Sequence, residues 1–381
     1  MESMNNLINS DLEQVKQWRR DLHQIPELAL TLPKTQRYLL NELSTLDCSL
    51  SQPIEYGIAA FFDAGKEKTL AFRTDMDALP VLEQTNVPFK SKHEGCMHAC
   101  GHDGHMSAML LFAKRLNEYY KSLPYNILLI FQPGEETPGG AKPMLDTGLF
   151  ERYNVIRVFG THLWPLIEKG ALATRKGPLM ASATEVDIRI HGKAVHSARK
   201  EEGIDALMVG TMFLKRAYEM EKALPSEVFR LLQFGKMEAG VVRNVVAGEC
   251  VIEGTLRAFE DEYVAYLKEG LESISQDLED QTGAKIEIIY HSAYPAVIND
   301  ADLVDTLLKL RPEMELLEKP LMIAEDFSYY QRKVPGVFFY TGTGTGIELH
   351  NARFDFDEDI LLKTVDLYED IAHQIFEYSK N

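Results

Sequence analysis

The chain has 381 residues, more than a single hydrophobic core usually supports, so we expect two domains. It contains 40 lysine and arginine residues against 58 aspartate and glutamate residues, and the net charge of −18 disfavours binding to nucleic-acid phosphates. Four cysteines are too few for a disulfide framework in a chain of this length. Since we find neither a basic and apolar leader nor an apolar run long enough to cross a bilayer, we expect a cytoplasmic protein without nucleic-acid or membrane partners.

The first part of the chain alternates between helical and strand patterns. Residues 11–46 carry apolar side chains at helical spacing, interrupted by prolines, which predicts two helices. Short apolar runs at 69–75, 126–133 and 155–163 predict buried strands, and the amphipathic stretch 105–120 predicts a helix. This alternation is typical of parallel strands joined by crossover helices and predicts an α/β fold.

The pattern changes in the middle of the chain. Residues 184–192 and 250–259 alternate between apolar and polar side chains, as half-exposed strands do. Helices are predicted at 205–222 and 260–280, and a further strand at 285–291. This order predicts a small sheet with helices on one face, which is an α+β domain inserted into the first domain.

The closing part of the chain returns to the first pattern. Residues 334–342 predict another buried strand, and residues 357–379 predict a long final helix. The first domain is therefore expected to be discontinuous, with its two parts at 1–178 and 293–381 and the inserted domain at 179–292.

One short motif, "HACGHDGH", concentrates side chains that bind metals. Imidazole and thiolate together suit zinc-like divalent ions, and the two glycines favour a loop whose backbone approaches something closely. No second cysteine pair accompanies it, so a closed structural zinc site is not expected, and the spacing of the cysteines does not fit a thiol redox pair. The candidate ligands are His98, Cys100, His102, Asp103 and His105.

Further polar side chains lie where the predicted strands end. Glu135 and Glu136 follow one strand, His162 ends the next, and Asp75 and Asp77 end the first. The carboxyl ends of strands in an open α/β sheet are where ligands bind. Two adjacent carboxylates can divide the work, one binding metal and the other acting as a general base. Taken alone, the glutamate pair could also be a solvated acidic turn.

His350 follows a glycine-rich turn, "TGTGTG", near the end of the chain. The turn superficially resembles a phosphate-binding loop, but it lacks the lysine and serine or threonine that should follow, and it precedes no predicted helix. We therefore do not expect nucleotide binding, and His350 becomes a further candidate for the metal site.

Seven motifs together resemble the amidohydrolase branch of the M20 metallopeptidase family: "RRDLHQIPE", "RTDMDALP", "HACGHDGH", "QPGEETPGGA", "GTHL", "AEDFSYY" and "LHNARFDFDED". The resemblance covers nearly the whole chain, and the motifs are specific in combination. The branch includes N-acetyldiaminopimelate deacetylases and N-acyl-amino-acid and hippurate hydrolases. The resemblance implies a two-domain protein with a zinc-peptidase-like α/β catalytic domain and an inserted α+β lid and dimerisation domain.

The resemblance also implies a site with two divalent metal ions, which could be Zn, Mn, Co or Ni. Glu135 matches the general base. Asp75 matches a residue that does not bind the metal itself but orients one of the metal ligands. Arg73 stands where other branches of the family carry a metal-binding histidine, and a cysteine thiolate is expected to compensate for it. The implied metal ligands are Cys100, His102, Glu136, His162 and His350.

The resemblance assigns substrate contacts to the inserted domain. His196 in "GKAVHSARK" matches a histidine that stabilises the oxyanion of the reaction, although Ala194 and Val195 replace glycines that are typical of the family. Asn244 and Arg257 match positions that hold the substrate. Alternatively, His196 is a polar residue on a loop between strand and helix.

The function implied by the resemblance is metal-dependent hydrolysis of the amide bond of N-acyl, especially N-acetyl, amino acids. The products are a carboxylic acid and a free amino acid, so the partner is a small molecule. A dipeptidase or carboxypeptidase of the same family is an alternative, and a metal-dependent binding protein without catalysis is another. A homodimer through the inserted domain and movement of that domain as a lid are also expected.

Overall fold

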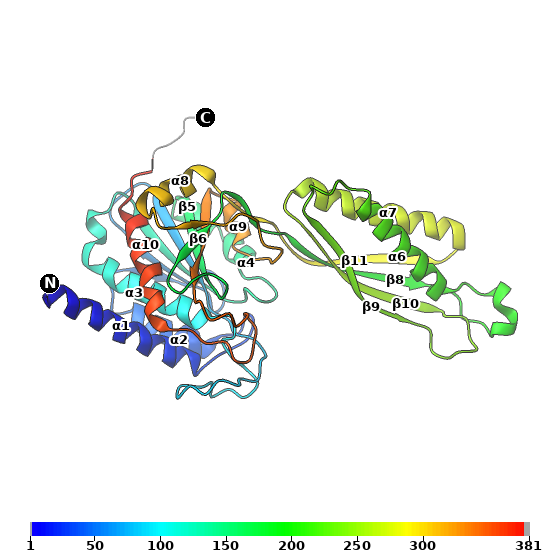
Figure 1. Ribbon diagram of the computed structural model, residues 1–381, viewed down its shortest axis with the longest axis horizontal. Coiled ribbons are helices and arrows are strands. Elements are labelled where there is room, and N and C mark those ends of the chain that lie inside the picture. Colours follow the sequence, from blue (N-terminus) through cyan, green and yellow to red (C-terminus); the bar gives the residue numbers. More distant parts are fainter. Residues whose placement is uncertain (1, 377–381) are drawn as a thin grey trace. The chain divides into compact units, whose positions relative to one another are not determined.

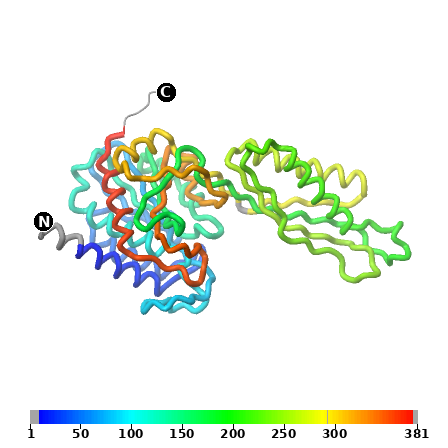
Figure 2. Tube along the Cα trace, viewed as in Figure 1, coloured from blue at the N-terminus to red at the C-terminus, as the bar shows by residue number. Residues whose placement is uncertain are grey.

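The computed structural model describes residues 2–376 (Figure 1). Contacts between Cα atoms divide the chain into two compact units, each of which has a sheet and a core of its own. Figure 2 shows residues 180–297 of the second unit in the green-to-yellow middle of the sequence, as expected for an insertion. Within the described residues, the first unit comprises 2–179, 298–320 and 326–376, and the second comprises 180–297 and 321–325.

The boundaries of the second unit differ from the predicted range 179–292. The unit extends to Val297, and it also takes in Leu321–Glu325, a segment far along the chain. Ala181 donates its backbone N–H to the carbonyl oxygens of Leu321 and Ile323, at 3.1 and 2.9 Å. Backbone pairing between segments this far apart has no local sequence signal, so the pattern of apolar residues could not predict it.

The first unit is built on an eight-stranded sheet with the order β1-β2-β4-β3-β5-β14-β6-β13. Its four central strands, β4, β3, β5 and β14, are parallel, as predicted, whereas β2 and β6 pair antiparallel with them at either side. The central strands β3, β4 and β14 are buried along their whole length, as continuous apolar runs in a parallel sheet require. The strands are β1 Ser49–Ser51, β2 Ile58–Phe62, β3 Thr69–Asp75, β4 Asn126–Gln132, β5 Val155–Trp164, β6 Leu172–Thr174, β13 Glu315–Leu316 and β14 Gly336–Gly342.

Two long helices of the first unit, α1 and α10, pack against a third, α3. The helix α3 contacts both α1 and α10, and the predicted pair of helices at 11–46 is present as α1 and α2 (Figure 1). The final helix ends at His373, earlier than predicted, and the predicted residues 377–379 lie outside the described part of the chain. The helices are α1 Glu2–His23, α2 Pro33–Leu43, α3 His102–Tyr119, α4 Ala141–Asp146, α5 Leu149–Arg152, α8 Ala301–Leu310, α9 Ser328–Gln331 and α10 Leu361–His373, with short 3₁₀ turns at Tyr120–Ser122 and Glu358–Ile360.

The motif "HACGHDGH" is only partly a loop, which corrects the sequence prediction. Helix α3 begins at His102, after Gly101, whose φ of 86° is left-handed and suits glycine. Gly104 is inside the helix, and a Cβ at this position would come within 2.6 Å of the ring of Phe356. The second glycine of the motif therefore serves close packing of α3 rather than a loop.

The start of α3 is fixed to α1 through a buried acid. Asp103 accepts hydrogen bonds from Nε of Arg19 at 3.0 Å and from Nδ1 of His23 at 2.7 Å. All three side chains are almost completely buried, so their opposite charges compensate one another away from water. This anchor explains why the motif "RRDLHQIPE" accompanies "HACGHDGH": the first motif holds the helix that carries the second.

The second unit is a four-stranded antiparallel sheet with the order β11-β8-β10-β9, packed against α6 and α7. In β8, buried and more exposed residues alternate, as predicted for a sheet covered on one face. Its elements are β8 Ala183–His191, a 3₁₀ turn at Ser197–Glu202, α6 Ala206–Lys222, β9 Arg230–Ala239, β10 Glu249–Ala258, α7 Asp261–Thr282 and β11 Lys285–Tyr294. The strands β7 Gly177–Met180 and β12 Val297–Asn299 lie where the chain passes between the units. Among residues 2–376, no helix is both long and apolar enough to cross a membrane.

Candidate metal centre

The structure brings the five predicted metal ligands together in the first unit. Cys100 and His102 lie at the start of α3, Glu136 follows β4, His162 is in β5 and His350 follows β14. One ligand atom from each of Cys100, His102 and Glu136 lies within 4.8 Å of the other two. Because β3, β4, β5 and β14 are parallel neighbours, the segments that follow them meet at one edge of the sheet.

Cys100 lies between two of the histidines. Its sulfur is 3.3 Å from Nε2 of His162 and 3.3 Å from Nε2 of His350. The backbone places His350 there, because its N–H donates to the carbonyl oxygen of Ala99 at 2.9 Å. His350 also has a φ of 65°, a left-handed conformation that is uncommon outside glycine and is often found at functional sites. Nε2 of His350 is also 3.2 Å from Oε1 of Glu136.

Two of the imidazoles are oriented by backbone carbonyl groups. Nδ1 of His102 is 2.8 Å from the carbonyl oxygen of Asp77, and Nδ1 of His162 is 2.7 Å from that of Leu163. A carbonyl oxygen only accepts, so in each ring Nδ1 carries a hydrogen and Nε2 is the nitrogen left to bind a metal. This is the usual second contact of a metal-binding histidine, and it presents Nε2 as the ligand atom.

The charges of the cluster fit a bound cation. Burial raises the pKa of the Cys100 thiol well above its usual range, and the carboxylates of Glu136 and Glu135 raise it further. Burial disfavours a charged His102, but the surrounding carboxylates, that of Asp75 foremost, nevertheless raise the pKa of this imidazole to about 10. Without a metal, the thiol and His102 therefore both hold a proton at neutral pH, and a divalent ion would replace these protons.

The donor set and its packing also fit a divalent ion. Thiolate, imidazole and carboxylate together suit the transition metals from manganese to zinc. Nε2 of His102 is buried and has no hydrogen-bond partner among the described residues, although it lies 3.9 Å from Oε1 of Glu136. A buried polar atom without a partner is costly, and a shared metal ion would satisfy both atoms.

Asp75 contacts His105, a candidate from the motif that is not among the five ligands implied by the resemblance. Oδ1 of Asp75 is 2.7 Å from Nδ1 of His105, whereas the nearest nitrogen of His102 is 3.8 Å away. Nε2 of His105 accepts the backbone N–H of Leu163 at 3.0 Å. His105 therefore uses both ring nitrogens within the protein, and together with Asp75 it holds the backbone next to His162.

Arg73 is fully buried and joins several polar groups behind the cluster. Its guanidinium donates to Oδ2 of Asp75 at 2.9 Å, to Oδ1 of Asp326 at 2.7 Å and to Oε1 of Gln132 at 3.0 Å. With His105 on its other oxygen, Asp75 has protein partners on both of its carboxylate oxygens. Arg73 thus compensates two buried carboxylates from within the protein.

The two adjacent glutamates both contact the buried residue Asp77. The sequence analysis placed Asp77 near the site but assigned it no role. Oδ1 of Asp77 accepts the backbone N–H of Glu135 at 2.9 Å, and Oδ2 accepts that of Glu136 at 3.1 Å. Asp77 is two positions after Asp75, and this spacing at the end of β3 was the available signal. His98, a further candidate from the motif, is buried near His23, with 6.4 Å between the ring centroids.

The predicted substrate-binding residues all lie in the second unit. His196 and Asn244 are on neighbouring segments, because Ser197 donates its N–H to the carbonyl oxygen of Asn244 at 3.0 Å. Both side chains are exposed. Arg257 is half-buried and donates to the carbonyl oxygen of Met322 at 2.6 Å, so one of its N–H groups holds the returning segment of this unit.

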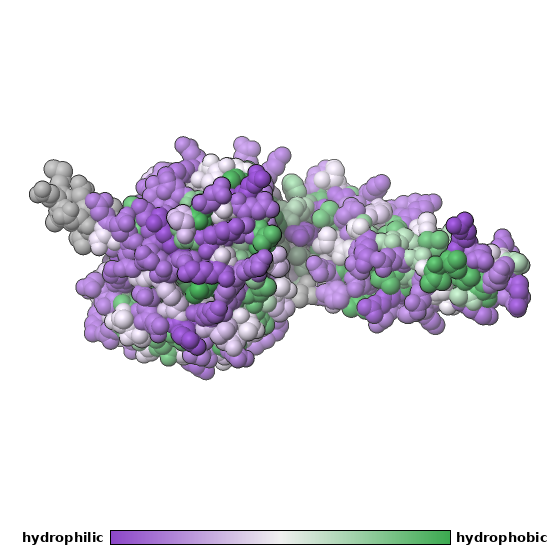
Figure 3. Space-filling model, turned by 90° about the horizontal axis from the view of Figure 1, so that it is seen from below, coloured by the Kyte–Doolittle hydropathy of each residue, from purple (hydrophilic) through white to green (hydrophobic). Residues whose placement is uncertain are grey.

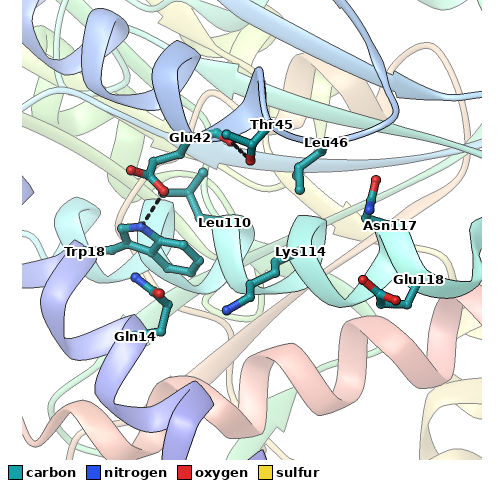
Figure 4. Close-up of a pocket in the computed structure, with 9 residues that line it drawn as sticks. All are labelled: Gln14, Trp18, Glu42, Thr45, Leu46, Leu110, Lys114, Asn117 and Glu118. Carbon is teal, nitrogen blue, oxygen red and sulfur yellow. Dashed lines mark hydrogen bonds between the residues drawn. The ribbon is translucent and has the colours of Figure 1, made fainter.

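A surface pocket of about 320 Å³ in the first unit is separate from this cluster (Figure 4). It lies among α1, α3 and the end of α2, and Figure 4 shows Trp18 donating to Glu42 on its wall. Lys114 is 5.9 Å from the centre of the Trp18 ring. None of the predicted site residues lines the pocket, so it is not the candidate active site.

The chain belongs to peptidase family M20/M25/M40, whose pattern matches residues 71–374. It is 35% identical over 374 residues to an uncharacterized hydrolase of Staphylococcus epidermidis, covering 94% of this chain and 97% of the relative. Among solved structures, a candidate aminohydrolase from methicillin-resistant Staphylococcus aureus has a TM-score of 0.90 at 30% identity, with 96% of each chain covered. A Bacillus subtilis protein described as a dinuclear metal-binding peptidase of the M20 family has a TM-score of 0.83 at 28% identity, covering 96% of this chain and 98% of the other.

Proposed function

We propose that this M20-family hydrolase cleaves the amide bond of N-acyl amino acids, with N-acetyl amino acids as the main substrates. The observation that carries the proposal is the convergence of a thiol, three imidazoles and a carboxylate beside a second glutamate, Glu135. The description of the S. aureus structure as a candidate aminohydrolase supports this proposal. The choice of an N-acyl amino acid rests on the motifs shared with the amidohydrolase branch of the family.

We further propose that the cluster holds two divalent ions, in keeping with the dinuclear description of the B. subtilis relative. When bound, the ions supply Lewis acidity that acidifies a water molecule and polarises the scissile carbonyl. In this proposal, Glu135 accepts a proton from the attacking water and delivers it to the leaving nitrogen. A C–O bond forms and the C–N bond breaks, so the products are a carboxylic acid and an amino acid.

The predicted roles of the second unit complete the proposal. We assign oxyanion stabilisation to His196 and substrate binding to Asn244 and Arg257, on the motifs that they match. His196→Ala is then expected to lower turnover while leaving the metal content unchanged. A loss of metal from this variant would contradict the assignment.

The experiment that tests the function starts from protein stripped with a chelator and reloaded separately with Zn²⁺, Mn²⁺, Co²⁺ or Ni²⁺. Each form is assayed against N-acetyl amino acids, N-benzoylglycine, N-acetyldiaminopimelate and dipeptides. We expect hydrolysis that the chelator abolishes and metal restores, with N-acyl amino acids cleaved faster than dipeptides.

Two other outcomes would replace this proposal. Faster cleavage of dipeptides would favour a dipeptidase, and the B. subtilis relative described as a peptidase gives this alternative its support. No hydrolysis of any amide by fully metal-loaded protein would favour a metal-dependent binding protein.

A further inference from the structure

Asp77 contacts both of the adjacent glutamates through their backbone. Its two carboxylate oxygens accept the consecutive N–H groups of Glu135 and Glu136, at 2.9 and 3.1 Å, and its side chain is completely buried. Consecutive backbone N–H groups that point to one anion form a binding concavity, and here an acidic side chain of the same chain fills it. The end of β3 is thereby tied to the loop that follows β4.

The same residue also contacts one of the histidines. The carbonyl oxygen of Asp77 is 2.8 Å from Nδ1 of His102, and its Oδ1 is 3.7 Å from the same nitrogen. Asp77 therefore touches the proposed base, a proposed carboxylate ligand and a proposed imidazole ligand, each through a different one of its oxygens. In the described part of the chain, it lies outside the groups of side chains that could together hold a metal ion.

The segment that Asp77 holds has little regular structure of its own. Glu135 and Glu136 lie in a turn between β4 and α4, preceded by Gly134 with a φ of 71°. Adjacent side chains in a turn can take many relative directions, so their adjacency alone does not place one at the reacting water and the other at the metals. Fixing both peptide groups on one rigid carboxylate removes this freedom before substrate binds.

We infer that Asp77 is a positioning residue whose carboxylate fixes Glu135 and Glu136 in their separate directions, one toward the reacting water and one toward the metals. The inference rests on the proposed function, because it deepens the roles assigned there to the two glutamates. It distinguishes Asp77 from Asp75, whose carboxylate holds His105 and Arg73 instead.

The test replaces Asp77 with asparagine, which is of the same size but has only one accepting oxygen. One of the two glutamate N–H groups then loses its acceptor. We expect Asp77→Asn to bind Co²⁺ about 10- to 100-fold more weakly, the usual effect of losing a group that orients ligands. At saturating Co²⁺ we expect kcat to fall at least tenfold with KM changed less than threefold, because the base is misplaced while substrate binding is intact.

The measurement at saturating metal separates positioning from charge. Asparagine also removes a negative charge near His102, and loss of charge alone would weaken metal binding without lowering kcat once the sites are full. Asp77→Ser is a second variant, whose hydroxyl keeps one acceptor in less space, in case asparagine is not accommodated.

Glu27→Gln is the matched control, because Oε2 of Glu27 accepts the consecutive N–H groups of Lys34 and Thr35, both at 2.9 Å. This carboxylate also accepts two consecutive N–H groups, although on one oxygen rather than two, and it holds the start of α2. We expect Glu27→Gln to keep wild-type metal affinity and turnover.

Several results would overturn the inference. It fails if either the Co²⁺ affinity or the saturated kcat of folded Asp77→Asn equals that of the wild type, or if Glu27→Gln shows the same losses. Loss of the folded state in both Asp77 variants, followed by circular dichroism, would assign Asp77 to the fold instead. If the metal-loaded wild type hydrolyses nothing, the proposed function fails, whereas a wild-type Co²⁺ affinity in folded Asp77→Asn overturns the role of Asp77 whatever the wild type hydrolyses.

Discussion

The sulfur of Cys100 and Nε2 of His350 lie 3.3 Å apart, although 250 positions separate the two residues in the chain. The contact depends on the backbone hydrogen bond from His350 to Ala99, which places the late segment directly beside the start of α3. Burial keeps the Cys100 thiol protonated in the absence of metal. Cys100 can therefore be a thiolate at this position only when a bound cation compensates its negative charge.

The first prediction concerns the thiolate itself. Adding Co²⁺ to metal-free protein should produce a thiolate-to-metal absorption band, because Cys100 loses its proton as it binds the ion. Cys100→Ser should lack the band, and Cys96→Ser should keep it, since Cys96 is the other cysteine of the motif and lies outside the clusters of described residues that could hold a metal. A band that survives in Cys100→Ser would contradict the assignment.

The second prediction concerns Arg73, whose guanidinium contacts Asp75 and Asp326 while fully buried. Replacing it with methionine leaves two buried carboxylates without this cation, so we expect a loss of about 3–5 kcal/mol in the free energy of unfolding. Urea unfolding of metal-free protein measures this loss. Lys142→Met is the control, because its ion pair with Asp146 is exposed. A change below about 1 kcal/mol in Arg73→Met would contradict the prediction.

The third prediction is a pH dependence that arises from His23. Burial opposes its charge, but Asp103 and Glu83 raise the pKa of this histidine to about 9, against 6.5 in the unfolded chain. Protonated His23 therefore stabilises the folded state by about 3 kcal/mol. This contribution is complete below pH 6.5 and is lost as the pH rises through 9.

His23→Gln tests this dependence by urea unfolding between pH 6 and pH 10. The wild type should be more stable than the variant at pH 6, and the difference should shrink steadily toward pH 10. His191→Gln, which changes an exposed histidine of the second unit, is the control and should show no such trend. A difference between wild type and His23→Gln that is constant with pH would contradict the prediction.

Much of the fold could be predicted from the sequence because its strongest signals are periodic. The apolar runs of β3, β4 and β5 and the alternation in β8 appear where they were expected. The antiparallel strands that flank the parallel core could not be predicted, because they are short and their direction depends on partners elsewhere in the chain. The packing of Leu321–Glu325 in the second unit could not be predicted for the same reason.

For the site, the residue types and their places at strand ends were predictable, but their partners were not. Sequence spacing placed Asp75 near the metal ligands, yet only the packing of α3 shows that it contacts His105 rather than His102. Likewise, nothing local in the sequence links the carboxylate of Asp77 to two peptide groups almost sixty positions later. Hydrogen bonds between distant segments are set by three-dimensional packing, which periodicity does not encode.

The fourth prediction is a homodimer through the second unit. The strands β9 and β11 are the edges of its sheet, and open edges can pair with a second copy. This unit also exposes large apolar side chains, including Leu207, Met208 and Val241, and Figure 3 shows hydrophobic residues on its visible face. Sedimentation at micromolar concentration should give twice the monomer mass, with cross-links between copies in the second unit. A monomer would refute this.

The fifth prediction separates Glu135 from Glu136, whose roles their adjacency leaves open. Oε1 of Glu136 lies 3.2 Å from Nε2 of His350 and 3.9 Å from Nε2 of His102, so this carboxylate is within the proposed ligand cluster. Glu136→Gln should therefore lose metal, and excess metal should restore part of its activity. Glu135→Gln should keep its metal yet lose about 10²- to 10⁴-fold in turnover, the usual contribution of a positioned general base.

Metal content by elemental analysis, measured beside turnover at several metal concentrations, decides between the two roles. No concentration of metal should rescue Glu135→Gln, because metal occupancy is not what this variant lacks. Glutamine keeps the size of each side chain, and both backbone N–H groups still reach Asp77, so each variant changes only one carboxylate. A metal-depleted Glu135→Gln together with a metal-replete Glu136→Gln would exchange the roles, and equal metal loss in both would mean that both carboxylates bind metal and that the base is another group.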